Sequence, residues 1–335
     1  MKLFPREAAA DQRLLEHRRP PAWILSGRNP RQRNAQETIQ SGAIQPLRPV
    51  DPRGALFALL VSLLWGANPV VIKLGLLDAP PLRLAGLRMV LGGATICLWA
   101  WATGRLAGLR VGPGEWRPLG YLGVLFAVQV GATHVGTALT SAAHSAILLN
   151  LYAVHTVVLA HFQIPGDRLT TRKLAGVLVA YAGIVLLFAR QVTLGAPTLL
   201  GDVIMFVAAL LLGERTVYLA RAVQRLDAVK LLLAQAVVGV ALFFLVSALF
   251  EPAATRWTWR LAGSVAYQGI LIAGFNFVVN LWLLRHYRAS ALAGFFLTQP
   301  LFGVLIAALV TGDPLTPELL IASAAVAVGI GLTSR

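Results

Sequence analysis

The chain has 335 residues and a net charge of +15, and 57% of its residues are hydrophobic while only 13% are charged. A soluble domain is about half apolar and a quarter charged, so the composition argues against a soluble protein. The single cysteine, Cys97, excludes a disulfide framework and a cysteine-based metal site. The basic residues are spread among short connections rather than gathered on one surface, so nucleic acid is not an expected partner.

The N-terminal stretch, residues 1–53, holds about ten lysines and arginines and is rich in Gln and Pro. Its longest apolar core is Trp23-Ile24-Leu25, which is too short for a signal peptide. We therefore expect a disordered, basic cytoplasmic arm. The alternative, that translation starts further along the chain, is left open by the sequence.

From Gly54 onward the sequence predicts about ten apolar segments, each close to the ~20 residues that cross a hydrocarbon core as a helix. A soluble all-helical protein would need polar faces on its outer helices, and almost none of these segments has one. We expect the spans at 54–76, 82–102, 117–138, 142–163, 172–190, 199–219, 228–250, 262–284, 290–311 and 317–333.

The connections between these segments differ in positive charge. With the N-terminus in the cytoplasm, the inner connections hold 11 lysines and arginines, and the outer ones hold three, Arg190, Arg256 and Arg260. Positive residues collect on the cytoplasmic side of membrane proteins. Both termini are therefore predicted to be cytoplasmic, in a multi-pass protein of the cell (inner or plasma) membrane.

The two halves of the chain contain the same sequence motif. Gly166-Asp167-Arg168-Leu169-Thr170 follows the fourth segment, and Gly312-Asp313-Pro314-Leu315-Thr316 follows the ninth, 146 positions later. Each half has five spans, an odd number, so the second half must enter the membrane upside down. The sequence thus predicts an all-α integral membrane protein of two inverted five-helix repeats, 54–190 and 199–333. We expect the Gly and Asp of each motif to end one helix and cap the next.

Several motifs resemble the EamA-like branch of the drug/metabolite transporter superfamily. In chain order they are Leu64-Trp65-Gly66-Ala67-Asn68 with Lys73, Leu87-Arg88-Met89, the small-residue stretch 138–143, both Gly-Asp motifs, and Gln299-Pro300. The resemblance covers about residues 54–333, with departures where Asp replaces Glu in the paired motif and where Ala153-Val154 replaces a proline of helix four. It implies export or import of small metabolites or drugs, often amino acids, by alternating access, with helices five and ten at the periphery.

Ionisable and amide side chains inside a span are costly, which makes them the first candidates for a substrate site. Glu214 would bind an ammonium group or carry protons, unless helix six ends near Gly213 and leaves Glu214-Arg215 at the headgroups. Arg88 would meet a carboxylate, or else pair with carbonyl groups. The candidate substrate-binding residues are Trp65, Asn68, Arg88, His134, Asn150, His155, Glu214, Asn276, Asn280 and Gln299.

The spacing of the histidines and the lack of a nucleotide-binding motif indicate which kinds of site the chain is not expected to have. His144 and His155 stand eleven residues apart, whereas metal ligation on a helix favours three or four, so no metal site, cofactor or catalytic residue is expected. The chain lacks Gly-x-x-x-x-Gly-Lys-Ser/Thr, which argues against an ATP-driven pump. The leading hypothesis is a secondary transporter, with export favoured, a small-molecule substrate and the lipid bilayer as partners, and a homodimer left open. The alternative is a lipid-handling protein or an intramembrane enzyme without solute transport.

Overall fold

The computed structural model describes residues 50–105, 109–164, 168–194, 197–223, 225–276, 279, 282–283, 286–287, 292 and 295–333. Residues 1–49 of the predicted arm lie outside the described residues, as do Gly166 and Asp167 of the first Gly-Asp motif.

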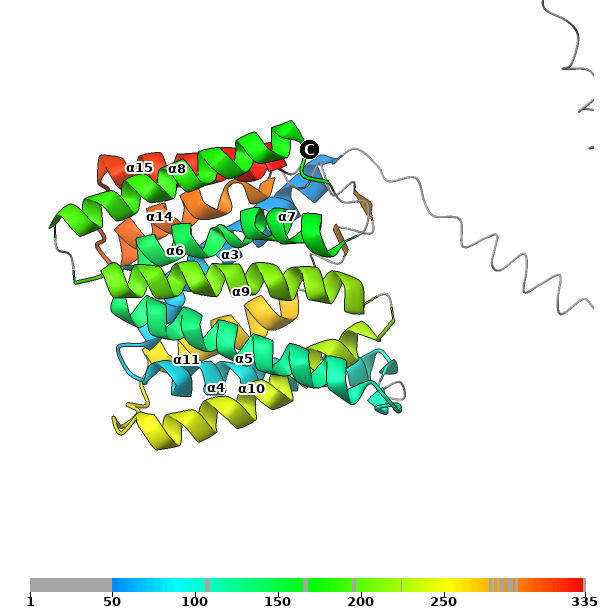
Figure 1. The fold of residues 1–335 in the computed structure, drawn as a ribbon. Coiled ribbons are helices and arrows are strands. Elements are labelled where there is room, and N and C mark those ends of the chain that lie inside the picture. The colour runs from blue at the N-terminus through cyan, green and yellow to red at the C-terminus, as the bar shows by residue number, and fades with distance from the viewer. Residues whose placement is uncertain are drawn as a thin grey trace, which may run out of the picture. The chain divides into compact units, whose positions relative to one another are not determined.

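The apolar segments fold as helices that run side by side (Figure 1). The first half forms α3 (Pro52–Gly75), α4 (Pro81–Ala102), α5 (Trp116–Leu139), α6 (Ala142–Asn150), α7 (Tyr152–Gln163) and α8 (Thr171–Leu194). The second half forms α9 (Leu199–Ala222), α10 (Ala228–Phe250), α11 (Trp259–Ala266), the π-helix η3 (Tyr267–Asn276), α14 (Gln299–Val310) and α15 (Pro317–Thr333).

The predicted all-helical membrane architecture is confirmed. In the described part of the chain, seven helical segments are long and apolar enough to cross a membrane, with α6 and α7 together counting as one. The shorter helices α14 and α15 are also apolar. The helix starts follow from local capping, because Asp51 accepts a hydrogen bond from the Gly54 amide at 2.7 Å and Asp227 accepts one from the Val229 amide at 2.8 Å.

Helix α9 spans the predicted segment 199–219 and three residues more. It continues to Ala222, so the alternative that this helix ends near Gly213 is wrong, and Glu214 and Arg215 lie within it. Gly213 lacks a Cβ where α9 meets α7, and a Cβ there would lie 2.8 Å from the Cβ of His155. This close packing against α7 supports the continuation of the helix past Gly213.

The second half repeats the packing of the first. Gly66 in α3 packs against Phe302 and Gly303 of α14, while Gly213 in α9 packs against His155 and Thr156 of α7. The two contacts correspond residue by residue at a separation of 147 positions: Gly66 with Gly213, Phe302 with His155, and Gly303 with Thr156. The same pair of helix faces is therefore built twice, once with α3 and α14 and once with α9 and α7.

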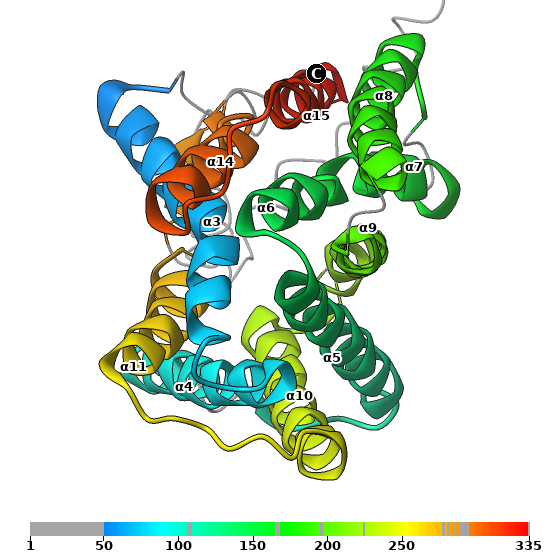
Figure 2. The ribbon, with the colours of Figure 1, turned by 90° about the vertical axis from the view of Figure 1, so that its left-hand side faces the viewer.

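Helices α8 and α15 lie side by side at one edge of the bundle (Figure 2). Gly176 of α8 meets the backbone of Gly329, where an added Cβ would lie 2.7 Å from the Gly329 carbonyl oxygen. Gly183 of α8 meets Ala322 in turn. At an offset of 146 positions, Gly183 corresponds to Gly329, and Gly176 corresponds to Ala322. These two contacts are therefore also repeats of each other. The backbones approach closely because small residues line the crossing.

The second Gly-Asp motif differs in detail from the expected cap. Gly312 ends α14 with φ 72°, in the left-handed region that favours glycine. Thr316, rather than Asp313, accepts the hydrogen bond that caps α15, from the Leu319 amide at 3.3 Å. Asp313 instead reaches across to α6, where its Oδ2 accepts from the Ala143 amide at 2.8 Å. The Asp of this motif therefore caps a helix of the other half of the chain.

Candidate binding cavity

A cavity of about 260 Å³ lies between α3, α4, α5, α6, α9, α10 and η3. It extends from the middle of α4 and α5 toward the C-terminal end of α9 and the N-terminal end of α10. Its polar and charged lining residues are Trp65, Asn68, Arg88, Gln129, Thr133, Arg215, Gln235 and Asn276. The rest of the lining is apolar and includes Met89, Ile96, Phe126, Val130, Leu212 and Ile272. Such a mainly apolar cavity with a few convergent polar groups is typical of a small-molecule site.

The cavity is lined at equivalent positions by both halves of the chain. Six pairs of lining residues are separated by 147 positions: Trp65 and Leu212, Asn68 and Arg215, Arg88 and Gln235, Met89 and Ala236, Phe126 and Ala273, and Gln129 and Asn276. The cavity therefore lies on the axis that relates the two repeats. This is the position at which transporters built from inverted repeats hold their substrates.

Several polar atoms at the cavity are buried and have no partner within the described part of the chain. The side-chain amide of Asn276 makes no hydrogen bond through either its oxygen or its nitrogen, and Oδ1 of Asn68 and Oε1 of Gln129 are equally unpaired. Unpaired polar groups at such depth are destabilising. They are the groups that a bound molecule would satisfy.

Arg88 and Arg215 bring two positive charges to the cavity. The guanidinium of Arg88, which is 9% exposed, donates one hydrogen bond to Gln268 Oε1 at 3.1 Å, and its Nε has no partner. Arg215 stacks its guanidinium 5.1 Å from the ring centre of Phe126, and its Nε is also unpaired. The sequence offered no periodicity that would orient Arg215. Its one signal was the repeat itself, which aligns Arg215 with Asn68.

Of the predicted site residues, Trp65, Asn68, Arg88 and Asn276 line the cavity. Gln129 and Gln235 were missed, although the repeat pairs them with Asn276 and Arg88. Asn280 lies outside the described residues.

The other candidates lie elsewhere in the described part of the chain. His134 is fully buried on α5, with Nδ1 2.9 Å from the Val130 carbonyl, and Asn150 donates to the Ala146 carbonyl at 2.7 Å. His155 packs between the rings of Tyr181 and Phe206. Two further candidates complete the set: Glu214 accepts a hydrogen bond from Gln163, and Gln299 is buried at the start of α14.

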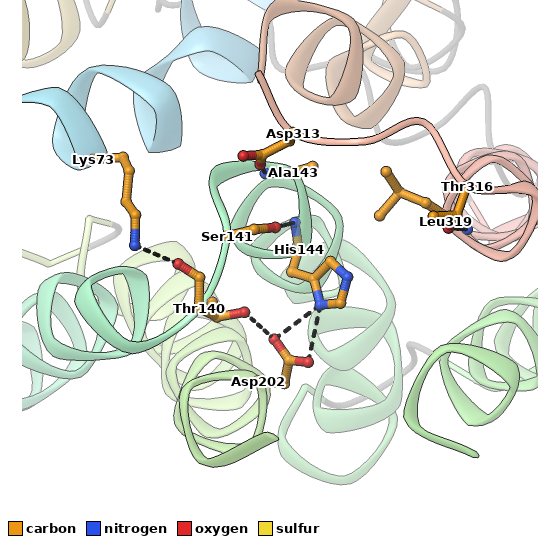
Figure 3. A network of polar contacts seen from close by, with 9 residues as sticks. All are labelled: Lys73, Thr140, Ser141, Ala143, His144, Asp202, Asp313, Thr316 and Leu319. Carbon is orange, nitrogen blue, oxygen red and sulfur yellow. Dashed lines mark hydrogen bonds and ion pairs between the residues drawn. The ribbon is translucent and has the colours of Figure 1, made fainter. Parts of the chain in front are cut away.

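A polar network joins the two halves at the end of the bundle that the charge pattern predicts to be outer (Figure 3). Lys73 at the end of α3 donates to the Thr137 carbonyl at 2.9 Å and to the Thr140 carbonyl. Fully buried Asp202 of α9 accepts a hydrogen bond from Thr140 and pairs with Nδ1 of His144 at 2.9 Å. With the contact from Asp313 to α6, the network connects α3, α5, α6 and α9 to the loop after α14.

At the same end of the bundle, Asp78 in the loop after α3 holds the loop before α11. It accepts two hydrogen bonds from Arg260, at 2.7 and 2.9 Å, and one from Thr258 at 2.6 Å. These bonds, from Arg260 first and then Thr258, lower the pKa of Asp78 to about 2. The side chain therefore stays ionised over the physiological range.

No group of three His, Cys, Asp or Glu side chains that could hold a metal ion occurs among the described residues.

The sequence profile of the EamA-like transporter family matches residues 52–189 and again residues 199–335. The predicted family resemblance is therefore confirmed in both halves.

Relatives match most of the chain. It is 23% identical to an uncharacterized transporter, YoaV, of Bacillus subtilis (strain 168), over 81% of this chain and 92% of that protein. It is 26% identical to a probable amino-acid metabolite efflux pump of Escherichia coli (strain K12), over 79% of this chain and 89% of that protein. A protein known from a crystal structure superposes with a TM-score of 0.60 at 22% identity, covering 84% of this chain and 96% of that one, so the fold is shared.

Proposed function

Because this chain belongs to the EamA-like transporter family, we propose that it is a secondary transporter that exports a small metabolite by alternating access. The observation that carries the proposal is the cavity on the axis between the repeats, lined at six matched pairs of positions. A site on this axis can be presented to either side of the membrane by rocking the two repeats against each other.

The arrangement at the two ends of the helices supports one conformational state of the transport cycle. Its lining runs along the C-terminal half of α9, from Leu212 to Leu219, and includes Leu232 in the first turns of α10. The charge pattern predicts those helix ends to be cytoplasmic. At the opposite ends, the network of Lys73, Asp202 and Asp313 holds the halves together. This arrangement corresponds to an inward-facing state in which the network closes the outer side.

The names of two relatives support a substrate class and a direction. Two of them are named as probable amino-acid metabolite efflux pumps, from Escherichia coli and Salmonella typhimurium. We therefore propose an amino acid or a related small metabolite as the substrate and export across the cell membrane as the direction.

The test is transport by the purified full-length chain in proteoliposomes. Labelled amino acids and related acids and amines are loaded inside or outside, and flux is followed with and without imposed pH, sodium and potassium gradients. We expect gradient-dependent flux of at least one compound, competed by its unlabelled form. Protein that unfolds cooperatively yet transports no member of the panel above empty liposomes would count against the proposal.

A tighter control uses the cavity itself. Asn276→Leu fills a polar position of the lining with an apolar side chain of similar size, and its amide makes no internal hydrogen bond that the substitution would break. Flux should fall while the thermal midpoint holds or rises, since the substitution also removes buried polar atoms that have no partner. Full flux in this variant would place the transport path elsewhere.

A further inference from the structure

The charge of the cavity identifies the class of its substrate. We propose that the transported molecule is a small organic anion, a carboxylate group on an apolar body, and that Arg88 and Arg215 bind its carboxylate. This inference rests on the proposed function, because it names the substrate of the same cavity.

The first argument is that both arginines are charged and incompletely paired. A guanidinium stays protonated in proteins, and a buried charge is costly unless it is paired. The hydrogen-bond partner of Arg88 is the neutral amide of Gln268. Arg215 stacks on the ring of Phe126 and lies near the side chain of Tyr152, a phenol that is neutral when protonated. None of these contacts neutralises a charge, and each arginine keeps a buried Nε without a partner.

The second argument is that no carboxylate lines the cavity in the described structure. Eight acidic side chains of the described residues are engaged elsewhere, with cations, helix amides or other helices: Asp51 with the start of α3, Asp78 with Arg260, Glu115 with Lys230, Asp202 with His144, Glu214 with Gln163, Asp227 with the start of α10, Glu251 with the start of α4, and Asp313 with the start of α6. The sequence offers no acid between Glu251 and Asp313. Among the described residues, therefore, no carboxylate of the lining balances the two arginines, and a ligand carboxylate would do so.

The third argument concerns symmetry. Arg88 is paired by the repeat with Gln235, and Arg215 with Asn68. Each arginine thus stands where the other half of the chain has a neutral amide, so each half contributes one positive charge from a different level of the bundle. A molecule held between them contacts both repeats, which is the requirement for coupling binding to rocking.

The remaining lining describes the rest of the ligand. Met89, Ile96, Phe126, Val130 and Leu149 present apolar surface and no charge. Within the described lining, an ammonium group would find only neutral acceptors, the side-chain oxygens of Asn68, Gln129, Thr133, Gln235 and Asn276, beside two like charges. The cavity therefore suits a carboxylate with an aromatic or branched aliphatic body, and it disfavours an amine.

The experiment compares four probes of one shape: phenylacetate, phenylacetamide, phenethylamine and phenylalanine. Binding to the purified full-length protein in detergent is measured by isothermal titration calorimetry. We expect the anion to bind about 10-fold or more tightly than the amide, because a hydrogen bond to a charged group is stronger than one to a neutral group. The amine should bind most weakly. An anion that binds no more tightly than the amide or the amine, or that does not bind, overturns the inference.

Variants then assign the charge to its residues. Arg88→Gln and Arg215→Gln should each weaken phenylacetate binding about 10-fold and change phenylacetamide binding less than about threefold. The matched control is Arg221→Gln, because Arg221 is exposed on the same helix as Arg215 and is absent from the cavity lining. Equal losses for the anion and the amide, or a loss in the control variant, would overturn the assignment.

The two proposals fail separately. If phenylacetate binds with the predicted charge preference but no gradient drives its flux in proteoliposomes, the proposed transport fails and the anion site stands. If the protein transports phenethylamine or phenylalanine in preference to phenylacetate, transport stands and the anion assignment is wrong.

Discussion

Replacing Gly66 by alanine should drive the two halves of the chain apart. A Cβ built on Gly66 lies 2.6 Å from the Gln299 carbonyl oxygen, 3.0 Å from the Phe302 Cβ and 3.1 Å from the Gly303 amide nitrogen. Two of these three atoms belong to the backbone of α14, so no side-chain rotation can relieve the contact. Helices α3 and α14 would have to separate by several tenths of an ångström along their crossing.

Two opposing effects set the size of the change. Overpacking a close contact typically costs about 1–3 kcal/mol, while alanine in place of glycine in a helix stabilises by up to about 1 kcal/mol. The contact should dominate, because the nearest atom lies well inside van der Waals distance, and we expect a net loss of about 1–2 kcal/mol. Gly120→Ala is the matched control, since Gly120 is also in a helix and no atom lies within 4 Å of its added Cβ.

The assay is thermal and denaturant unfolding of both variants in the same detergent, followed by tryptophan fluorescence. Gly66→Ala should unfold at a lower temperature than wild type, and Gly120→Ala at the same or a higher temperature. If the two variants shift together, helix propensity decides the outcome and the close approach of α3 and α14 contributes nothing. That result would refute the reasoning.

Three further predictions concern the polar groups outside the cavity. Asp78→Asn should lower the unfolding temperature at neutral pH. Folding lowers the pKa of Asp78 from 3.8 to about 2, so the stability that this carboxylate contributes is present above about pH 4 and is lost as the pH falls toward 2. The unfolding temperatures of variant and wild type should therefore converge as the pH is lowered. Asp313→Ala should cost about 1 kcal/mol through loss of the acceptor for the Ala143 amide, while Asp313→Asn should retain most of that stability; unfolding midpoints decide between them, and equal midpoints would contradict the cap. Glu214→Gln should leave phenylacetate affinity within about twofold of wild type, because Gln163 rather than the cavity holds that side chain; a tenfold loss by calorimetry would contradict this placement.

The fold was predictable because its two main signals are long. Hydropathy located most of the described helix ends within a few residues, although α14 begins at Gln299 rather than near the predicted residue 290. The motif that recurs at Gly312 revealed the repeat. The sequence predicted a span at 199–219 but left open a helix end near Gly213, since a glycine followed by a charged pair is also typical of a helix end. Packing against His155 and Thr156 decides it, and packing partners are not visible in one sequence.

The cavity was predictable only in part, for a related reason. A span that is apolar on every side has no periodicity to say which face is inward, so Trp65, Asn68 and Arg88 were identified by residue type alone. Arg215 had the residue type as well, but its place near a presumed helix end suggested a headgroup contact. Applying the repeat to the candidates, residue by residue, pairs Asn68 with Arg215 and Asn276 with Gln129. This comparison would have added the missing members.

The crossing of α8 and α15 has a consequence for how such a chain arises. Gly176 meets Gly329, and Gly183 meets Ala322, which are the same two positions exchanged. A contact of this kind is isologous: each partner presents one patch, and that patch is its own complement. At this crossing, a five-helix unit would present the same surface to an oppositely inserted copy of itself. Two such units could be fused by a linker. After fusion, a larger side chain on either helix of this crossing would clash with the small residue that faces it.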